Sequence, residues 1–313
     1  MATVFGIRRE DKNKWERRVP VVPADVANLS RDHDVAFHVQ PSPIRVFTDG
    51  EYAGVGATVC EDLAGADIVL AVKEIPEAYL LPRKVYVFFS HTVKGQDYNM
   101  PMLRHILDQG ATLIDYERIV DEQNRRLVFF GIDAGHAGMV ESLRCFGQRL
   151  AHLGQRTPFA EVLQPWRYGT LAAAEVALRA IGETIELGGP GDHRRPVVVG
   201  IAGYGNVSRG CQDVLDWLPV REVAFADLPV AAAAGLGEVG PLLKVVFREE
   251  HMAEPKAPEA QFTLQDYYQR PENYRGVFAR HLPHLDILMN TIYWDDRYPR
   301  LVTRRWARSH YGE

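Results

Sequence analysis

The chain has 313 residues, of which 46% are hydrophobic and 25% are charged, with a formal net charge of −5 at pH 7. This composition is typical of a globular protein long enough for two domains, and it argues against a nucleic-acid partner. The few, scattered cysteines (Cys60, Cys145 and Cys211) predict no disulfide framework and no metal site, and the lack of a leader or spanning segment predicts a cytoplasmic protein without membrane contact.

The first 130 residues alternate short apolar runs with helix-like segments. The sequence predicts strands at 3–7, 35–39, 67–72, 85–89 and 112–114, and helices at 23–30, 51–54 and 100–110. Strands that alternate with helices are typical of an α/β fold with a doubly wound parallel sheet.

Polar side chains follow each of these predicted strands. Ligands of open parallel sheets bind at the carboxyl ends of the strands, where Arg and Lys can hold carboxylates and Lys and His can move protons. Structural roles remain open: Lys73 as a solvated lysine, His91 as a strand-end histidine bonded to the backbone, Glu117 as a partner of Arg118. The residues at these strand ends are Arg8, Arg9, Lys73, Glu74, His91, Lys94, Asp115 and Glu117.

The middle of the chain reads as two helices, at 135–152 and 170–181, with a polar gap between them at 155–167. A glycine-rich segment at 188–196 follows and predicts a hinge. We therefore expect a first domain at 1–134, linking helices at 135–194 and a second domain at 195–313.

Residues 196–218 read as a buried strand, a glycine turn and an amphipathic helix. Gly203 and Gly205 form a G-x-G that lets the backbone approach a pyrophosphate, although a purely structural turn is the alternative. The first turn of the helix would offer its N–H groups to that anion. These helix residues are Asn206, Val207 and Ser208, and Ser208 stands where a third glycine is usual.

A further strand is expected at 222–226, ending at Asp227. An acidic residue about 20 positions beyond the glycines can accept the 2′-hydroxyl of a cofactor ribose. The same carboxylate would repel a 2′-phosphate, so Asp227 favours NAD over NADP.

Seven motifs in one order add a resemblance that covers nearly all of the chain. They resemble the lysine–2-oxoglutarate reductase part of bifunctional aminoadipic semialdehyde synthase and, more distantly, lysine-forming saccharopine dehydrogenase and alanine dehydrogenase. The motifs are ERRVPVVP (16–23), AVKEIP (71–76), FFSHTVK (88–94), LIDYE (113–117), GIDAGHAGM (131–139), AGYGNVSRG (202–210) and NTIYWDDRYPRLVTR (290–304).

This resemblance implies two Rossmann-like domains separated by a cleft, and an NAD(P)H-dependent oxidoreductase of lysine metabolism. Such an enzyme condenses lysine with 2-oxoglutarate to an imine and reduces it to saccharopine, or runs the reverse reaction. Lys73 and His91 match the acid–base positions of the family, and Glu74 and Glu117 would set their protonation balance. Arg18, Lys94 and Arg126 match positions that hold substrate carboxylates, while Asn290 and Ile292 would lie by the nicotinamide.

Two departures leave questions open at this point. Family members continue beyond residue 313, so we expect the second domain to lack its C-terminal part, as a fragment or a short form would. Reductase members commonly use NADPH, whereas Asp227 favours NADH. An alanine-dehydrogenase-like enzyme for a smaller amino acid and a non-catalytic nucleotide- or amino-acid-binding regulatory module are the alternatives, and a homo-oligomer is compatible with each.

Overall fold

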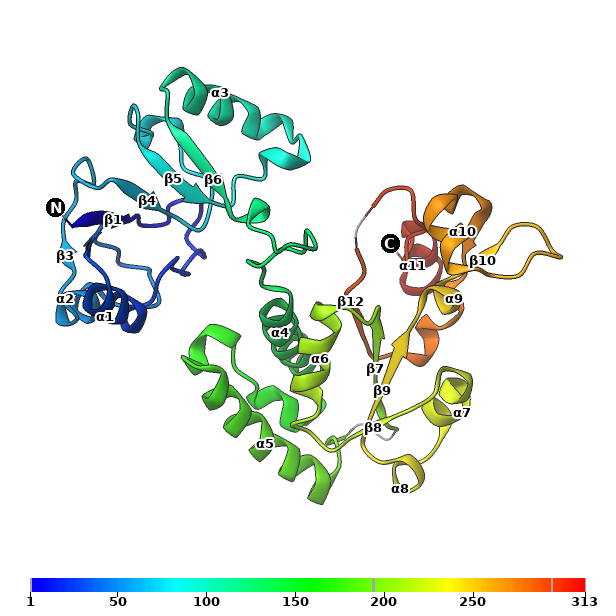
Figure 1. Cartoon of the computed structure of the whole chain (residues 1–313). Helices are drawn as coiled ribbons and strands as arrows, with labels where there is room; N and C mark the ends of the chain where they lie inside the picture. Colours follow the sequence, from blue (N-terminus) through cyan, green and yellow to red (C-terminus); the bar gives the residue numbers. More distant parts are fainter. Residues whose placement is uncertain (1, 193–194, 294, 313) are drawn as a thin grey trace. The chain divides into compact units, whose positions relative to one another are not determined.

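The structure is a computed structural model that describes residues 2–192, 195–293 and 295–312. The chain divides into two units, Met1–Phe129 and Phe130–Glu313, each with its own sheet (Figure 1). This division differs from the expected ranges 1–134, 135–194 and 195–313, because the helices between residues 135 and 194 pack into the core of the second unit.

The first unit is built on a six-stranded parallel sheet in the order β3-β2-β1-β4-β5-β6. In this order the chain reverses its direction of growth between β1 and β4, which makes their carboxyl ends a topological switch point. The strands are β1 (Thr3–Ile7), β2 (Val35–Val39), β3 (Thr58–Val59), β4 (Ile68–Leu70), β5 (Val85–Phe88) and β6 (Thr112–Asp115), and the helices are α1 (Pro23–Asp32), α2 (Asp49–Gly54) and α3 (Met100–Asp108).

Two apolar clusters hold helices against the two sides of this sheet (Figure 1). Val26 of α1 and Tyr52 of α2 pack with Ile7 of β1. Met102 and Ile106 of α3 belong to the other cluster. The helix α2 begins two residues before its predicted start because Thr48 and Glu51 form a capping box.

The second unit contains a four-stranded parallel sheet in the order β12-β7-β9-β8. A small antiparallel pair, β10 and β11, lies beside it in the same unit. The strands are β7 (Val197–Ala202), β8 (Val220–Glu222), β9 (Leu242–Phe247), β10 (Ala253–Pro255), β11 (Tyr274–Gly276) and β12 (Ile287–Asn290). The helices are α4 (Gly131–His152), α5 (Leu171–Gly188), α6 (Asn206–Leu215), α7 (Leu228–Ala233), α8 (Leu236–Val239), α9 (Glu249–Met252), α10 (Leu264–Gln269) and α11 (Arg304–Tyr311).

Strand β7 is buried along its whole length because helices cover both faces of its sheet (Figure 1). Side chains alternate between the faces of a strand, and here Val199 packs with α4, α5 and α6 while Val198 packs with α7. The predicted α/β class with two doubly wound parallel sheets is therefore confirmed.

Helices α4 and α6 approach so closely that glycines face each other at their crossing. A Cβ atom on Gly135 would overlap the carbonyl oxygen of Val207, and one on Gly210 would overlap that of Ile132. Helix backbones come this close only where side chains are absent. Gly210 thus fixes where α6, and the glycine turn before it, lie on the sheet.

The prediction of a strand at 222–226 was wrong about where the strand lies. Strand β8 ends at Glu222, and Phe225–Asp227 forms a 3-10 turn that leads into α7. Pro229 in the first turn of α7 favours helix rather than strand after Asp227. Helix α5 also extends seven residues beyond its predicted end at 181, and Gly189 with a φ of +76° terminates it.

Candidate functional site

In the first unit, a buried carboxylate connects the ends of the two strands at the switch point. Glu10, just beyond β1, accepts hydrogen bonds from the backbone N–H groups of Val72 (2.6 Å) and Lys73 (3.0 Å), just beyond β4. Burial raises the pKa of Glu10, although these two N–H groups act in the opposite direction. The contact fixes the backbone from which the side chain of Lys73 extends.

The positive charge of Lys73 acts on a second carboxylate, that of Glu16, and lowers its pKa. Burial acts to raise the pKa of Glu16, but the bonds from Arg18 and the nearby charge of Lys73 outweigh it, so this pKa is lowered. Arg18 donates from Nε (2.8 Å) and Nη2 (2.5 Å) to the two oxygens of Glu16. Of the residues predicted for the site, Arg18 therefore bonds Glu16 directly, and the charge of Lys73 acts on the same carboxylate.

His91 follows β5 and adopts a left-handed backbone conformation with a φ of +54°. Such a conformation is uncommon for residues other than glycine and clusters at functional sites. It brings Nδ1 of His91 to 3.4 Å from Oε2 of buried Glu117, whose Oε1 lies 3.0 Å from Nη1 of Arg126. One carboxylate thus contacts both the predicted acid–base histidine and the predicted substrate-binding arginine.

Asp115, the last residue of β6, holds Glu117 in place. Its Oδ1 accepts the backbone N–H of Glu117 at 2.8 Å, and its Oδ2 accepts from the backbone N–H and the hydroxyl of Ser90. Ser90 lies just beyond β5 and directly before His91, so its bonds to Asp115 connect the carboxyl ends of β5 and β6 next to this histidine.

Glu74 completes the set of charges at this edge of the sheet. Burial acts to raise its pKa, but a hydrogen bond from Lys12 (2.6 Å) and the charge of His91 lower it overall. Glu10 and Glu16 were missed as site residues, although Glu10 meets the same strand-end criterion as the others. The structure brings together Arg18, Lys73, Glu74, His91, Glu117 and Arg126, whereas the side chain of Lys94 lies outside the described part of the chain.

In the second unit, the glycine turn after β7 has the geometry of a phosphate cradle. Gly203 has a φ of +103°, and a Cβ there would lie 3.0 Å from Oγ1 of Thr291, so a larger residue would be strained and crowded. Gly205 is the N-cap of α6 and, among the described residues, nothing lies within 4 Å of the place of its Cβ. This combination of an open turn and a helix N-terminus fits a dinucleotide pyrophosphate.

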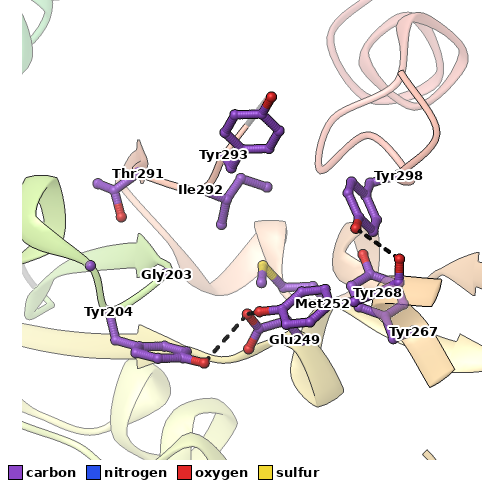
Figure 2. A pocket seen from close by; sticks show the side chains of 11 residues that line it. Gly203, Tyr204, Glu249, Met252, Tyr267, Tyr268, Thr291, Ile292, Tyr293 and Tyr298 are labelled. Carbon is purple, nitrogen blue, oxygen red and sulfur yellow. Dashed lines mark hydrogen bonds between the residues drawn. The ribbon is translucent and has the colours of Figure 1, made fainter. Parts of the chain in front are cut away.

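A cavity of about 340 Å³ opens at this turn (Figure 2). Its walls are rich in tyrosine, and Tyr268 donates a 2.6 Å hydrogen bond to Oε1 of Glu249, which also lies 3.5 Å from the hydroxyl of Tyr204. Burial and the Glu249 carboxylate raise the pKa of Tyr268, so the phenol stays a donor. The lining residues are Gly203, Tyr204, Gly205, Glu249, Met252, Tyr267, Tyr268, Thr291, Ile292, Tyr293 and Tyr298.

Some of the predicted cofactor residues lie at this cavity. Asn290 ends β12, and its side chain accepts the backbone N–H of Ile292 at 3.4 Å. The side chain of Ser208 is fully buried and accepts a hydrogen bond from Gln212. The part of α6 that faces the glycine turn is therefore the backbone of its first three residues, Asn206, Val207 and Ser208. Gly203, Gly205 and Ile292 line the cavity directly.

Asp227 does not line the cavity at the glycine turn. It is exposed and lines a different cavity, of about 330 Å³, with Glu222 and Glu238. Glu249, which was not predicted as a site residue, lies at the glycine cavity instead. The sequence feature that could have indicated Glu249 as a site residue is its position two residues beyond the apolar strand β9.

Both units are thus doubly wound α/β units, the first with titratable groups at its switch point and the second with a dinucleotide-type glycine turn. This architecture defines the class of two-unit, Rossmann-like α/β proteins. Residues 6–137 match the family model "Alanine dehydrogenase/PNT, N-terminal domain".

Over nearly its whole length the chain is similar to alpha-aminoadipic semialdehyde synthases, which confirms the resemblance seen in the motifs. It is 37% identical to the synthase of Arabidopsis thaliana over 96% of this chain and 30% of that protein. It is 36% identical to the mitochondrial synthase of Mus musculus over 98% of this chain and 33% of that protein. A saccharopine dehydrogenase (NAD⁺, L-lysine-forming) of Neurospora crassa is 30% identical over 74% of this chain and 61% of its own length.

The chain therefore spans about a third of the length of the synthases that it matches. Within residues 2–192, 195–293 and 295–312, no helix is both long and apolar enough to cross a membrane. In the same ranges no group of three His, Cys, Asp or Glu side chains could hold a metal ion. The cytoplasmic location and the homo-oligomer stay predictions.

Proposed function

We propose that this chain is an NAD(P)H-dependent oxidoreductase acting on a CH–NH group, which condenses lysine with 2-oxoglutarate to saccharopine or catalyses the reverse reaction. The observation that carries the proposal is the cluster of Lys73, His91 and Arg18 with buried carboxylates at the switch point of the first unit. Relatives named for saccharopine and aminoadipic semialdehyde chemistry support the choice of substrates.

Lys73 and His91 are proposed to move the protons of the condensation. Attack of the lysine ε-nitrogen on the keto carbon requires a proton to leave the nitrogen, and loss of the hydroxyl as water requires a proton to arrive. Glu117 at 3.4 Å would orient the imidazole of His91, and Glu10 would fix the backbone of Lys73.

Arg18 and Arg126 are proposed to hold substrate carboxylates together with Lys94. A guanidinium carries five N–H donors, so it can bond a protein carboxylate and a substrate carboxylate at once. Arg18 already bonds Glu16 and Arg126 already bonds Glu117, which fixes the direction of each guanidinium. Several cations suit a product with three carboxylates.

The second unit is proposed to bind the nicotinamide dinucleotide, which supplies the hydride when bound. Gly203, Gly205 and the backbone of Asn206, Val207 and Ser208 would hold its pyrophosphate. Asn290 and Ile292, at the end of β12, would contact the nicotinamide. By the same roles, the first unit, Met1–Phe129, would bind the substrate and the second unit, Phe130–Glu313, the cofactor.

The test is to mix the chain with lysine, 2-oxoglutarate and either NADH or NADPH, and to follow the absorbance of the reduced nicotinamide. We expect oxidation that depends on both substrates, with saccharopine identified by mass spectrometry. A folded chain that turns over with neither cofactor would refute the proposal. Tight binding of nucleotide or amino acid without turnover would instead indicate a regulatory module.

An alanine-dehydrogenase-like activity on a smaller amino acid is the second candidate, because the family model matched by residues 6–137 bears that name. Both activities need the same cations and proton carriers. Substrate profiling separates them: oxidation of alanine by NAD⁺, with no reaction between lysine and 2-oxoglutarate, would favour the second.

A further inference from the structure

The order of strands in the second unit places β9, and not β8, beside β7. In the common dinucleotide-binding order, the strand after the glycine helix lies next to the first strand and ends in the acidic residue that contacts the ribose. Here β9 pairs with β7 from Val197↔Leu242 to Ala202↔Phe247, and β8 forms the edge. The residues that follow Phe247 are therefore the neighbours of the glycine turn.

A direct hydrogen bond joins the end of β9 to that turn. The backbone N–H of Gly203 donates to the carbonyl oxygen of Phe247 at 2.9 Å. Glu249 comes two residues later and lines the same cavity as Gly203 and Gly205 (Figure 2). An acidic side chain thus stands at the strand end where a ribose contact is expected, although it is more than 40 residues from the glycines.

The carboxylate of Glu249 is held in position on one side only. Both of its hydrogen bonds, from Tyr268 at 2.6 Å and from Tyr204 at 3.5 Å, reach Oε1. Within the described part of the chain, no hydrogen bond reaches Oε2 of Glu249. That oxygen can accept from the hydroxyls of a ribose.

The charges around Glu249 decide which nicotinamide cofactor fits. Arg248 could accommodate a 2′-phosphate, and its guanidinium lies 5.3 Å from the ring of Tyr204. It lines a neighbouring cavity together with Glu249 and Glu250, whose charges oppose an added phosphate. We propose that Glu249, rather than Asp227, accepts the hydroxyls of the adenosine ribose and makes the chain prefer NADH to NADPH. This rests on the proposed binding of a nicotinamide dinucleotide.

The test is to titrate the whole chain with NADH and with NADPH by calorimetry, in the wild type and in Glu249→Gln. We expect the wild type to bind NADH more tightly, and Glu249→Gln to weaken NADH binding about 10-fold or more while NADPH binding is kept or improved. Tyr268→Phe should weaken NADH binding less, because it only loosens the carboxylate. Exposed Glu259→Gln is the matched control, and thermal melts establish that each variant is folded.

Equal affinities of the wild type and Glu249→Gln for both nucleotides would overturn this inference while the proposed function stands. A loss of NADH binding in Asp227→Asn, with Glu249→Gln unaffected, would overturn it in favour of the residue predicted from sequence. A folded wild type that binds neither nucleotide would overturn the proposed function, and this inference with it.

Discussion

Nδ1 of His91 lies 3.4 Å from Oε2 of Glu117, and the other oxygen of the same carboxylate lies 3.0 Å from Nη1 of Arg126. A proton carrier and a candidate substrate anchor therefore depend on one buried side chain. A substitution at Glu117 therefore changes the surroundings of both His91 and Arg126, while these two residues themselves are kept.

We expect Glu117→Gln to lower kcat about 10- to 100-fold, because hydrogen bonds to a charged group contribute about 1.5–3 kcal/mol and each 1.4 kcal/mol corresponds to tenfold. Steady-state kinetics with lysine, 2-oxoglutarate and reduced nicotinamide measure it. Glu122→Gln, in an exposed position five residues later, is the control. Equal kcat values for the two variants would contradict the role of Glu117.

Lys73→Met and His91→Gln should each slow turnover by about 10²–10⁴-fold if these residues transfer protons. The controls are Lys14→Met and His33→Gln, both at exposed positions of the same unit. Binding of the nucleotide, measured by calorimetry, should stay unchanged in all four variants. Rates that match the controls would show that the acid–base assignment is wrong.

The stability of the second unit should fall in mild acid because of two half-buried histidines. His251 stacks on Phe225 at 3.9 Å, His281 lies 5.7 Å from Phe247, and burial lowers the pKa of both imidazoles. Below an ordinary histidine pKa of about 6.5, the unfolded chain binds more protons than the folded one, so stability is lost as the pH falls.

Thermal melts between neutral pH and about pH 5 test this, since the titration begins near the ordinary value of about 6.5. The double variant His251→Gln/His281→Gln should show a weaker dependence of Tm on pH than the wild type. His152→Gln, at an exposed position, should keep the wild-type slope. Identical slopes in the wild type and the double variant would argue against the histidines as the cause.

Gly210→Ala should destabilise the second unit by about 1–3 kcal/mol or more, because the added methyl group meets the backbone of α4. Gly237→Ala is the matched control, since among the described residues nothing lies within 4 Å of a Cβ there. Urea denaturation measures both changes. Binding of the nucleotide should weaken in Gly210→Ala as well, because α6 begins at the glycine turn. A Gly210→Ala variant as stable as Gly237→Ala would contradict the tight crossing.

Much of the fold was predictable because its signals are local. The apolar run of β7, the glycines after it and the helix that follows lie within 23 residues, 196–218, and each is recognised by composition or spacing. Lys73, Glu74 and His91 could be proposed for the first site because parallel strands all end at one edge of a sheet. Local patterns therefore determined the α/β class and most candidates in the first unit.

Contacts between distant segments were decided only by the tertiary structure. No local pattern indicates that β9 pairs with β7 ahead of β8, and that pairing brings Glu249 to the glycine turn while Asp227 lies elsewhere. The facing glycines Gly135 and Gly210 are 75 positions apart, and the backbone N–H groups beyond β4 donate to Glu10 from about 60 positions away. Such pairs depend on hydrogen bonds between strands and on packing across elements, which the periodicity of a single segment does not encode.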